Sequence, residues 1–121
     1  MPSNARAPYR RLADIRDNIQ LAQRFIAGLA YNEFRDSDLV FYAVTRCLEI
    51  ISEASRRLRD EMKARHPHII WADIAGAGNI YRHDYEDVQH RIVWGTVREK
   101  LPELLEMAMQ ELAAEPDASR G

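Results

Sequence analysis

The sequence has one cysteine, few glycines and prolines, and no long apolar run, and each shortage excludes something. A single cysteine, Cys47, rules out an intrachain disulfide and a zinc site built from cysteines. No run of about 18 apolar residues occurs, so no segment is expected to span a bilayer. The opening residues, MPSNARAPYRRL, carry charge but no apolar segment of the kind that secretory signals need. We therefore expect a cytoplasmic protein without a membrane partner.

The chain also lacks a large charge of either sign. Its 121 residues carry a net charge of −2, with 46% hydrophobic and 30% charged residues. This length and composition are typical of one globular domain. A protein that coats nucleic acid without regard to sequence would be basic, so that class is excluded. An enzyme that contacts a few phosphates through a local basic cluster is not.

Apolar residues recur every three or four positions along most of the chain, which predicts helices. The predicted helices cover residues 10–29, 37–65, 71–83 and 88–113, and the last restarts at Pro102. We expect an all-α fold, an antiparallel bundle of four to five helices. The predicted domain covers residues 10–114, between disordered segments at 1–9 and 115–121.

Local signals refine these helices. Asp36 or Ser37 is suited to cap the second helix, and Cys47 occupies an apolar position where a buried thiol is expected. Residues 69–71, an apolar Ile-Ile-Trp run, are expected to form a buried connector. Gly76 and Gly78 in the third helix indicate either close packing against another backbone or room for a group from elsewhere.

The stretch GNIYRHDY, residues 78–85, concentrates the side chains that carry chemistry. Arg82 offers a forked positive charge suited to phosphate, and His83 can exchange a proton near neutral pH. If the stretch is helical, Arg82 lies one turn after Gly78 and leans over the bare surface that the glycine leaves. The alternative is a solvated Arg82 with His83 bonded to a carbonyl.

Other polar residues have two interpretations each. Glu53 either lies at the edge of an apolar stripe and pairs with an arginine, or orients Arg82 or His83 through a charged hydrogen bond. His66 and His68 resemble a metal-binding pair, but no carboxylate or cysteine follows at ligand spacing, so we expect no metal site and no cofactor.

Three runs together resemble the HepT-like branch of the HEPN superfamily, over about residues 10–113. These runs are EIISEASRRL (49–58), IAGAGNIYRHDYEDVQHRIVWGTV (74–97) and LPELLEM (101–107). The resemblance implies a helical bundle that forms a two-fold dimer with a shared cleft. It also implies a toxin of a toxin–antitoxin pair (type II or VII) that acts as a metal-independent endoribonuclease. The implied partners are RNA, a second copy, and a minimal nucleotidyltransferase antitoxin that transfers AMP to a motif tyrosine.

The family motif is an arginine, any four residues, a histidine, any residue and a tyrosine. His83 and Tyr85 match its second half, and Asn79 matches the asparagine that often follows the arginine. The motif arginine is replaced by Gly78, and Arg82 precedes the histidine instead.

The resemblance therefore implies catalytic roles for Asn79, Arg82 and His83, and modification at Tyr85, with Tyr81 a weaker candidate. Arg91 and Arg98 on the next helix would extend a basic cleft. Because the motif arginine is displaced, the alternative is an inactive module that binds a nucleotide or docks a nucleotidyltransferase.

Overall fold

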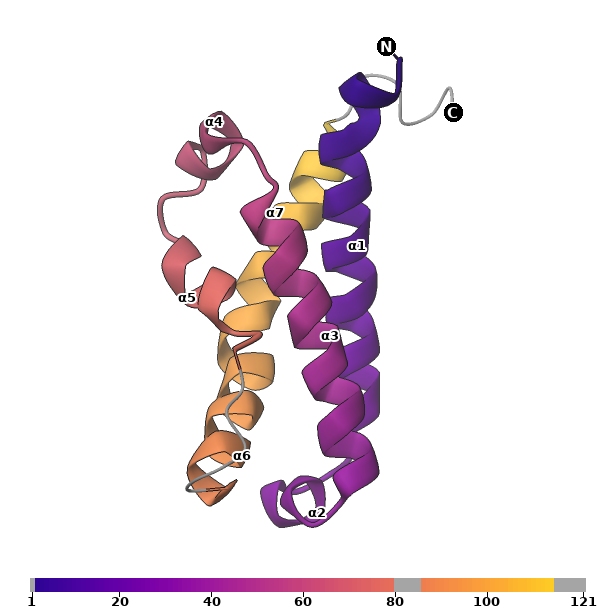
Figure 1. Cartoon of the computed structure of the whole chain (residues 1–121), viewed down its shortest axis with the longest axis vertical. Coiled ribbons are helices and arrows are strands. Elements are labelled where there is room, and N and C mark those ends of the chain that lie inside the picture. The colour runs from indigo at the N-terminus through magenta and orange to yellow at the C-terminus, as the bar shows by residue number, and fades with distance from the viewer. Residues whose placement is uncertain (1, 80–85, 115–121) are drawn as a thin grey trace.

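The structure is a computed structural model that describes residues 2–79 and 86–114. All of its regular structure there is helical, as predicted (Figure 1). The elements are α1 (Pro2–Ile26), α2 (Tyr31–Arg35), α3 (Asp38–Arg56), α4 (Asp60–Ala64), α5 (Trp71–Gly76), α6 (Glu86–Gly95), the π-helical segment η1 (Thr96–Lys100) and α7 (Leu101–Ala113). The described part therefore has more helices than the four to five predicted. The additional ones are the short helices α2, α4 and α5.

Three long helices form the body of the molecule. α1 contacts both α3 and α7, and Figure 1 shows α3 and the α6–α7 column running opposite to α1. Five apolar residues of α1 that recur at the predicted spacing of three or four positions are buried: Leu12, Ile15, Ile19, Ala22 and Ile26. The core continues through α3 and α7. Its largest fully buried side chains are Phe34, Leu12, Ile15, Ile19, Leu48, Ile51, Leu101, Leu104, Met107, Val44, Val93 and Val97.

α1 begins and ends earlier than predicted. It starts at Pro2, so the backbone of residues 2–9 is helical where the sequence predicted disorder. A proline suits the first turn of a helix because its missing N–H needs no partner there. α1 stops at Ile26 rather than Leu29 because Gly28 adopts a φ of 78°, a left-handed conformation that ends helices.

The predicted second helix is divided into α3 and α4. Of the two predicted caps, Ser37 is the one that caps α3, since its Oγ accepts a hydrogen bond from the Val40 N–H at 3.2 Å. α3 ends at Arg56, because Arg57 and Leu58 bond back only three residues. This turn buries Leu58 and Met62, and the buried position of Cys47 is also confirmed.

The predicted third helix is much shorter than residues 71–83. α5 ends at Gly76, where the Ala77 N–H bonds to the Ile74 carbonyl and the Asn79 N–H to the Gly76 carbonyl. Gly78 therefore lies outside α5, so the prediction that Arg82 follows it by one helical turn does not have a helical starting point. In the preceding connector Ile69 is buried as predicted, but Ile70 is 65% exposed.

The C-terminal helix changes its winding before Pro102, as the predicted restart requires. η1 is a π-helical segment, and Pro102 then lies at the start of α7. A proline has no N–H to donate, so the wider turn before it accommodates the interrupted hydrogen-bond ladder. No helix in the described ranges is long and apolar enough to cross a membrane.

Candidate active site around residues 78–85

The predicted site residues are divided between described and undescribed parts of the chain. Tyr81, Arg82, His83 and Tyr85 lie outside the described residues. Asn79 and Glu53 are described, and so are the two elements that flank the motif, α5 before it and α6 after it. The geometry of the site is therefore built from these flanks.

α3 holds the C-terminal end of α5. The buried Ser52 Oγ donates a hydrogen bond to the Ile74 carbonyl oxygen at 2.9 Å. Arg56 Nη2 donates to the Ala75 carbonyl oxygen, also at 2.9 Å. The Ile74 carbonyl also accepts from the Ala77 N–H, so Ser52 adds a second hydrogen bond to it. Arg56 binds a carbonyl in the last turn of α5, where carbonyls lack a partner within the helix. This fixes the chain just before Asn79.

Gly78 shows the close packing that its sequence position suggested. A Cβ atom at Gly78 would lie 2.9 Å from Ser52 Oγ and 3.0 Å from the Glu49 Cα. Gly76, by contrast, has nothing within 4 Å of the same position. The space that we assigned to the Arg82 guanidinium is thus occupied by α3, and that part of the hypothesis is wrong. A glycine is needed there because two backbones approach each other closely.

Asn79 terminates the turn that follows α5. Its N–H donates to the Gly76 carbonyl at 3.0 Å, and its side chain is exposed. The amide side chain is therefore accessible at the entrance to the motif.

Glu53 pairs with arginines of its own helix. Its carboxylate accepts hydrogen bonds from Arg57 Nε at 2.8 Å and from Arg56 Nη1 at 3.1 Å. Arg57 chiefly, and Arg56 with it, hold the pKa of Glu53 below its usual value. The arginine-paired interpretation is confirmed. Because Arg56 also bonds to α5, Glu53 steadies the residue that fixes the chain before the motif.

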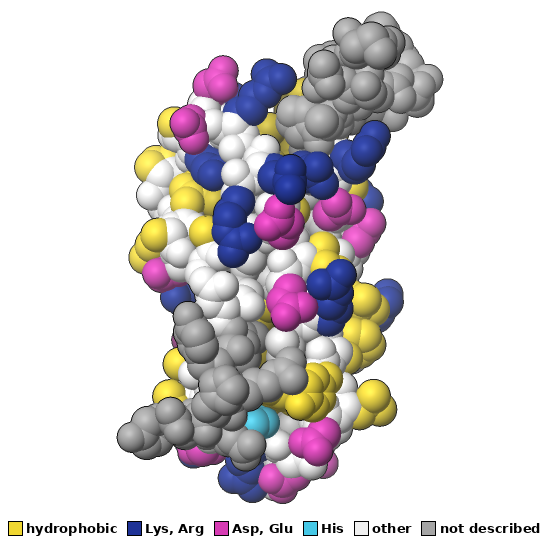
Figure 2. Space-filling model, viewed as in Figure 1, with side chains coloured by type: hydrophobic (Ala, Val, Ile, Leu, Met, Phe, Trp, Pro, Cys, Tyr) yellow, Lys and Arg dark blue, Asp and Glu magenta, His cyan; other side chains and the backbone are white. Residues whose placement is uncertain are grey.

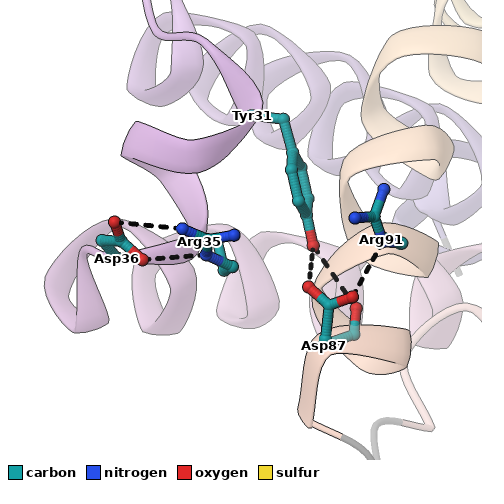
Figure 3. Close-up of polar contacts among 5 residues, drawn as sticks. All are labelled: Tyr31, Arg35, Asp36, Asp87 and Arg91. Atoms are coloured by element: carbon teal, nitrogen blue, oxygen red, sulfur yellow. Dashed lines mark hydrogen bonds and ion pairs between the residues drawn. The ribbon is translucent and has the colours of Figure 1, made fainter.

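A second cluster lies immediately after the motif, where α6 faces α2 (Figure 3). Asp87 Oδ1 accepts a hydrogen bond from the Tyr31 hydroxyl at 2.9 Å, and Asp87 Oδ2 accepts one from Arg91 Nε at 2.8 Å. Arg91 lowers the pKa of Asp87 most, followed by Tyr31. Burial, reinforced by the bond to Asp87, raises the pKa of Tyr31.

Two arginines flank the Tyr31 ring. The Arg91 guanidinium carbon lies 4.7 Å from the ring centroid and that of Arg35 lies 6.0 Å away. Arg35 also pairs with Asp36 at 2.8 Å (Figure 3). Arg91 is therefore committed to Asp87 and Tyr31, while Arg98 lies over the Trp94 ring at 5.3 Å. Neither is an isolated basic group.

The sequence does not single out Tyr31 or Arg35, and it suggests Asp36 only as a helix cap. The composition of residues 31–38, YNEFRDSD, was the available signal, since aromatic and charged residues gather there between two apolar stripes. Only the fold shows that this segment, as α2, lies against the start of α6.

Of the histidine pair before α5, His66 makes a structural contact. His66 Nε2 lies 2.6 Å from Glu111 Oε2 on α7, and both side chains are almost buried. Among the residues that the structure describes, no group of three His, Cys, Asp or Glu side chains is arranged to hold a metal ion. On the face shown in Figure 2, acidic and basic side chains are interspersed.

The chain matches the model of one protein family, "Ribonuclease HepT-like", over residues 15–111. This range includes both flanks and the motif. No solved structure matches the chain.

Curated relatives agree with this match. A protein of Methanocaldococcus jannaschii named "Putative RNase" is 33% identical over 93 residues, which is 77% of this chain and 85% of the relative. "Probable ribonuclease HepT" of Thermococcus cleftensis is 36% identical over 93 residues, 77% of this chain and 84% of the relative. A "Putative RNase" of Caldanaerobacter subterraneus is 32% identical over 90 residues, 74% and 80% of the two chains. The chain belongs to the ribonuclease HepT-like family.

Proposed function

We propose that the protein is an endoribonuclease that cleaves RNA without a metal ion, acting in the cytoplasm as the toxin of a toxin–antitoxin pair. The observation that carries the proposal is the family match across residues 15–111, together with relatives named as ribonucleases. The chain keeps the histidine and tyrosine of the motif, His83 and Tyr85, inside that range.

RNA supplies its own nucleophile, the 2′-hydroxyl next to the scissile phosphate. His83 removes the proton from that hydroxyl or delivers one to the leaving 5′-oxygen. A positioned acid or base of this kind accelerates a reaction by about 10²–10⁴-fold. Arg82 stabilises the charge that develops on the non-bridging oxygens. The exposed Asn79 amide positions a phosphate oxygen, and Tyr85 donates a hydrogen bond nearby.

The described flanks support this arrangement. Groups that act on a developing charge must be held in place before the reaction. Ser52 and Arg56 bond to the carbonyls of α5 just before the motif, and Asp87 bonds to Tyr31 just after it. Both ends of the motif segment are therefore anchored to other elements, which favours a defined site.

Assembly and silencing complete the proposal. Two copies related by a two-fold axis would bring two motifs to one cleft and concentrate basic groups there. A nucleotidyltransferase antitoxin would bind the toxin and transfer AMP to Tyr85. The added phosphate would bring negative charge to the place where the RNA phosphate binds, and repulsion would close the site.

Product chemistry tests the proposed reaction. We expect purified protein in EDTA to cut single-stranded RNA and leave a 2′,3′-cyclic phosphate and a 5′-hydroxyl. An oligonucleotide with a 2′-deoxy sugar before the cleaved bond should be intact at that bond. Cleavage that depends on added metal, or that proceeds at the 2′-deoxy position, would contradict the mechanism.

One observation favours a second candidate, an inactive module that binds a nucleotide or docks a nucleotidyltransferase. The motif arginine position is Gly78, and α3 leaves no room there even for a Cβ atom. Expression in bacteria separates the candidates. Growth arrest that disappears with His83→Ala supports the nuclease, whereas two harmless proteins support the binding module.

Mass spectrometry tests the regulation separately. Co-expression with the nucleotidyltransferase encoded beside it should add AMP to Tyr85. The Tyr81→Phe protein should be modified as well as the unaltered chain, and Tyr85→Phe should not. The reverse pattern would assign the modification to Tyr81.

A further inference from the structure

A pocket opens between α2, the start of α3 and α6, beside the cluster around Asp87. Its volume is about 330 Å³, and its described walls include Asp36, Asp38, Tyr42, Asp87, Gln89 and His90. This volume is at the lower end of the range for small-molecule sites, about 300–1,000 Å³. Asp87 comes two residues after Tyr85, so the pocket begins where the motif ends.

The carboxylates of the pocket are not equivalent. Asp36 is paired with Arg35 at 2.8 Å, and Asp87 is paired with Arg91 at 2.8 Å. Asp38 has no ion pair and accepts no side-chain hydrogen bond from any residue that the structure describes. The wall therefore carries one carboxylate, in the first turn of α3, that no described cation pairs with, while Arg35 in the same wall is paired with Asp36. A carboxylate accepts through two oxygens and repels phosphate, so this pocket suits a neutral group with N–H donors.

Aromatic side chains form another part of the wall. The Phe41 and His90 rings are stacked with their centroids 4.0 Å apart, and the exposed Tyr42 ring lies edge-on to Phe41 at 6.0 Å. Proteins that bind single-stranded RNA place splayed bases against aromatic or histidine rings and read their Watson–Crick edges by hydrogen bonds. A pocket with rings, one free carboxylate and a Gln89 amide has these components.

We propose that this pocket binds a guanine base of the RNA next to the cleaved bond, with Asp38 as the residue that selects it. Guanine presents two adjacent donors, N1–H and the N2 amino group, which match the two oxygens of one carboxylate. Uracil presents one donor between two carbonyl oxygens, which Asp38 repels. The assignment of the base to an RNA substrate rests on the proposed ribonuclease function.

Binding of uncleavable RNA tests the pocket in the full chain. The probes are 2′-O-methyl oligouridines whose central base is guanine, hypoxanthine or uracil, followed by fluorescence anisotropy. Hypoxanthine lacks the N2 amino group and so removes one of the two hydrogen bonds. We expect hypoxanthine to bind about tenfold more weakly than guanine, since a tenfold change corresponds to one charged hydrogen bond of about 1.4 kcal/mol. Uracil, which also turns carbonyl oxygens toward Asp38, should bind more weakly still.

Asp38→Asn should abolish this preference. The matched control is Asp60→Asn, which removes an exposed carboxylate from the first turn of α4 instead of α3 and should keep the preference. Equal binding of the three probes, or a guanine preference that survives in Asp38→Asn, would overturn the proposal. A further contradicting result is that Asp38→Asn weakens the binding of a lysine-rich peptide but not that of the guanine probe, because the pocket would then bind protein.

Cleavage of the matching all-ribose oligonucleotides keeps the two proposals apart. Guanine-selective binding without cleavage would contradict the ribonuclease function and leave the pocket standing. Cleavage without any effect of the base or of Asp38→Asn would contradict the pocket and leave the ribonuclease function standing.

Discussion

Two carboxylates join distant parts of this chain, and they differ mainly in burial. Glu111 on α7 binds Arg65 at 2.7 Å and His66 at 2.6 Å, and its side chain is only 11% exposed. Asp87 on α6 binds Tyr31 at 2.9 Å and Arg91 at 2.8 Å, and its side chain is 54% exposed. Each carboxylate is shared between an arginine and a ring donor. The chemistry is similar, but water reaches only one of them freely.

The difference in burial indicates that the Glu111 contact stabilises the fold, whereas the Asp87 contact lies beside the candidate site. Breaking the Glu111 contact is costly because Glu111 and His66 are both shielded from water, although the Arg65 side chain is 55% exposed. An exposed pair contributes little to folding because water solvates its members equally well. The Glu111 contact therefore fixes the end of α4 to α7. The Asp87 contact sets the shape and charge at the rim of the pocket after the motif.

The largest expected effect is that of Glu111→Gln on stability. Two charged hydrogen bonds weaken at a nearly buried position, so we expect the free energy of unfolding to fall by about 2 kcal/mol. The matched variant Asp87→Asn, changed at the exposed position, should unfold almost as the unaltered chain does. Urea denaturation of both variants measures the comparison. Equal losses would show that burial does not distinguish the two contacts.

Gly78→Ala should have the next largest effect. Its Cβ atom would lie 2.9 Å from Ser52 Oγ and 3.0 Å from a backbone atom of Glu49. Such overpacking costs about 1–3 kcal/mol. Gly76→Ala is the control, since no atom lies within 4 Å of its Cβ position. That change should be neutral or stabilising in thermal unfolding, and a destabilisation as large as that of Gly78→Ala would contradict the packing argument.

Lowering the pH should reduce the free energy of unfolding gradually as Glu111 becomes protonated, an effect smaller than those of the two substitutions above. Hydrogen bonds from Arg65 chiefly, helped by His66 and opposed by burial, hold the pKa of Glu111 below its ordinary value of 4.5. A carboxyl with a lowered pKa in the folded state stabilises the fold above its unfolded pKa. This contribution disappears as the pH falls through the folded value.

The free energy of unfolding should therefore fall more steeply below pH 4.5 in the unaltered chain than in Glu111→Gln. The pKa of Asp87 is also lowered, but that carboxyl is present in both proteins and cancels in the difference. Denaturation at several pH values measures the two slopes. Parallel curves would mean that Glu111 does not couple folding to protonation.

The smallest expected effect concerns the pKa of Asp87 itself. Arg91 lowers this pKa most and the Tyr31 hydroxyl contributes next. Arg91→Gln should raise the pKa of Asp87 further than Tyr31→Phe does, with both variants still folded. Carboxyl carbon NMR shifts followed against pH give the values directly. A larger rise in Tyr31→Phe would reverse the assigned order of the two contacts.

The sequence predicted the long helices well because their apolar period is regular. The stripe of α1, the Ser37 cap, the buried Cys47 and the restart at Pro102 all follow from local patterns. The early end of α5 did not, because Gly76 and Gly78 are compatible with either a helix or a turn. The close approach of α3, which leaves no room for a Cβ atom at Gly78, depends on tertiary packing and has no local signal.

The candidate site was predictable in part. Residue types and their order identified His83 and Tyr85, since a motif is local in sequence. Tyr31 and Asp38 could not be assigned in this way because they precede the motif by tens of residues and approach α6 only in the fold. A side chain that acts through a long-range contact leaves no periodic signal.

The rate of RNA cleavage by His83→Ala tests the central claim most directly. The measurement compares this variant with the unaltered chain in EDTA, under single-turnover conditions and with equal folding by circular dichroism. We expect the rate to fall by about 10²–10⁴-fold, the contribution of a general acid or base. An unchanged rate would contradict the assignment of the chemistry to the motif segment.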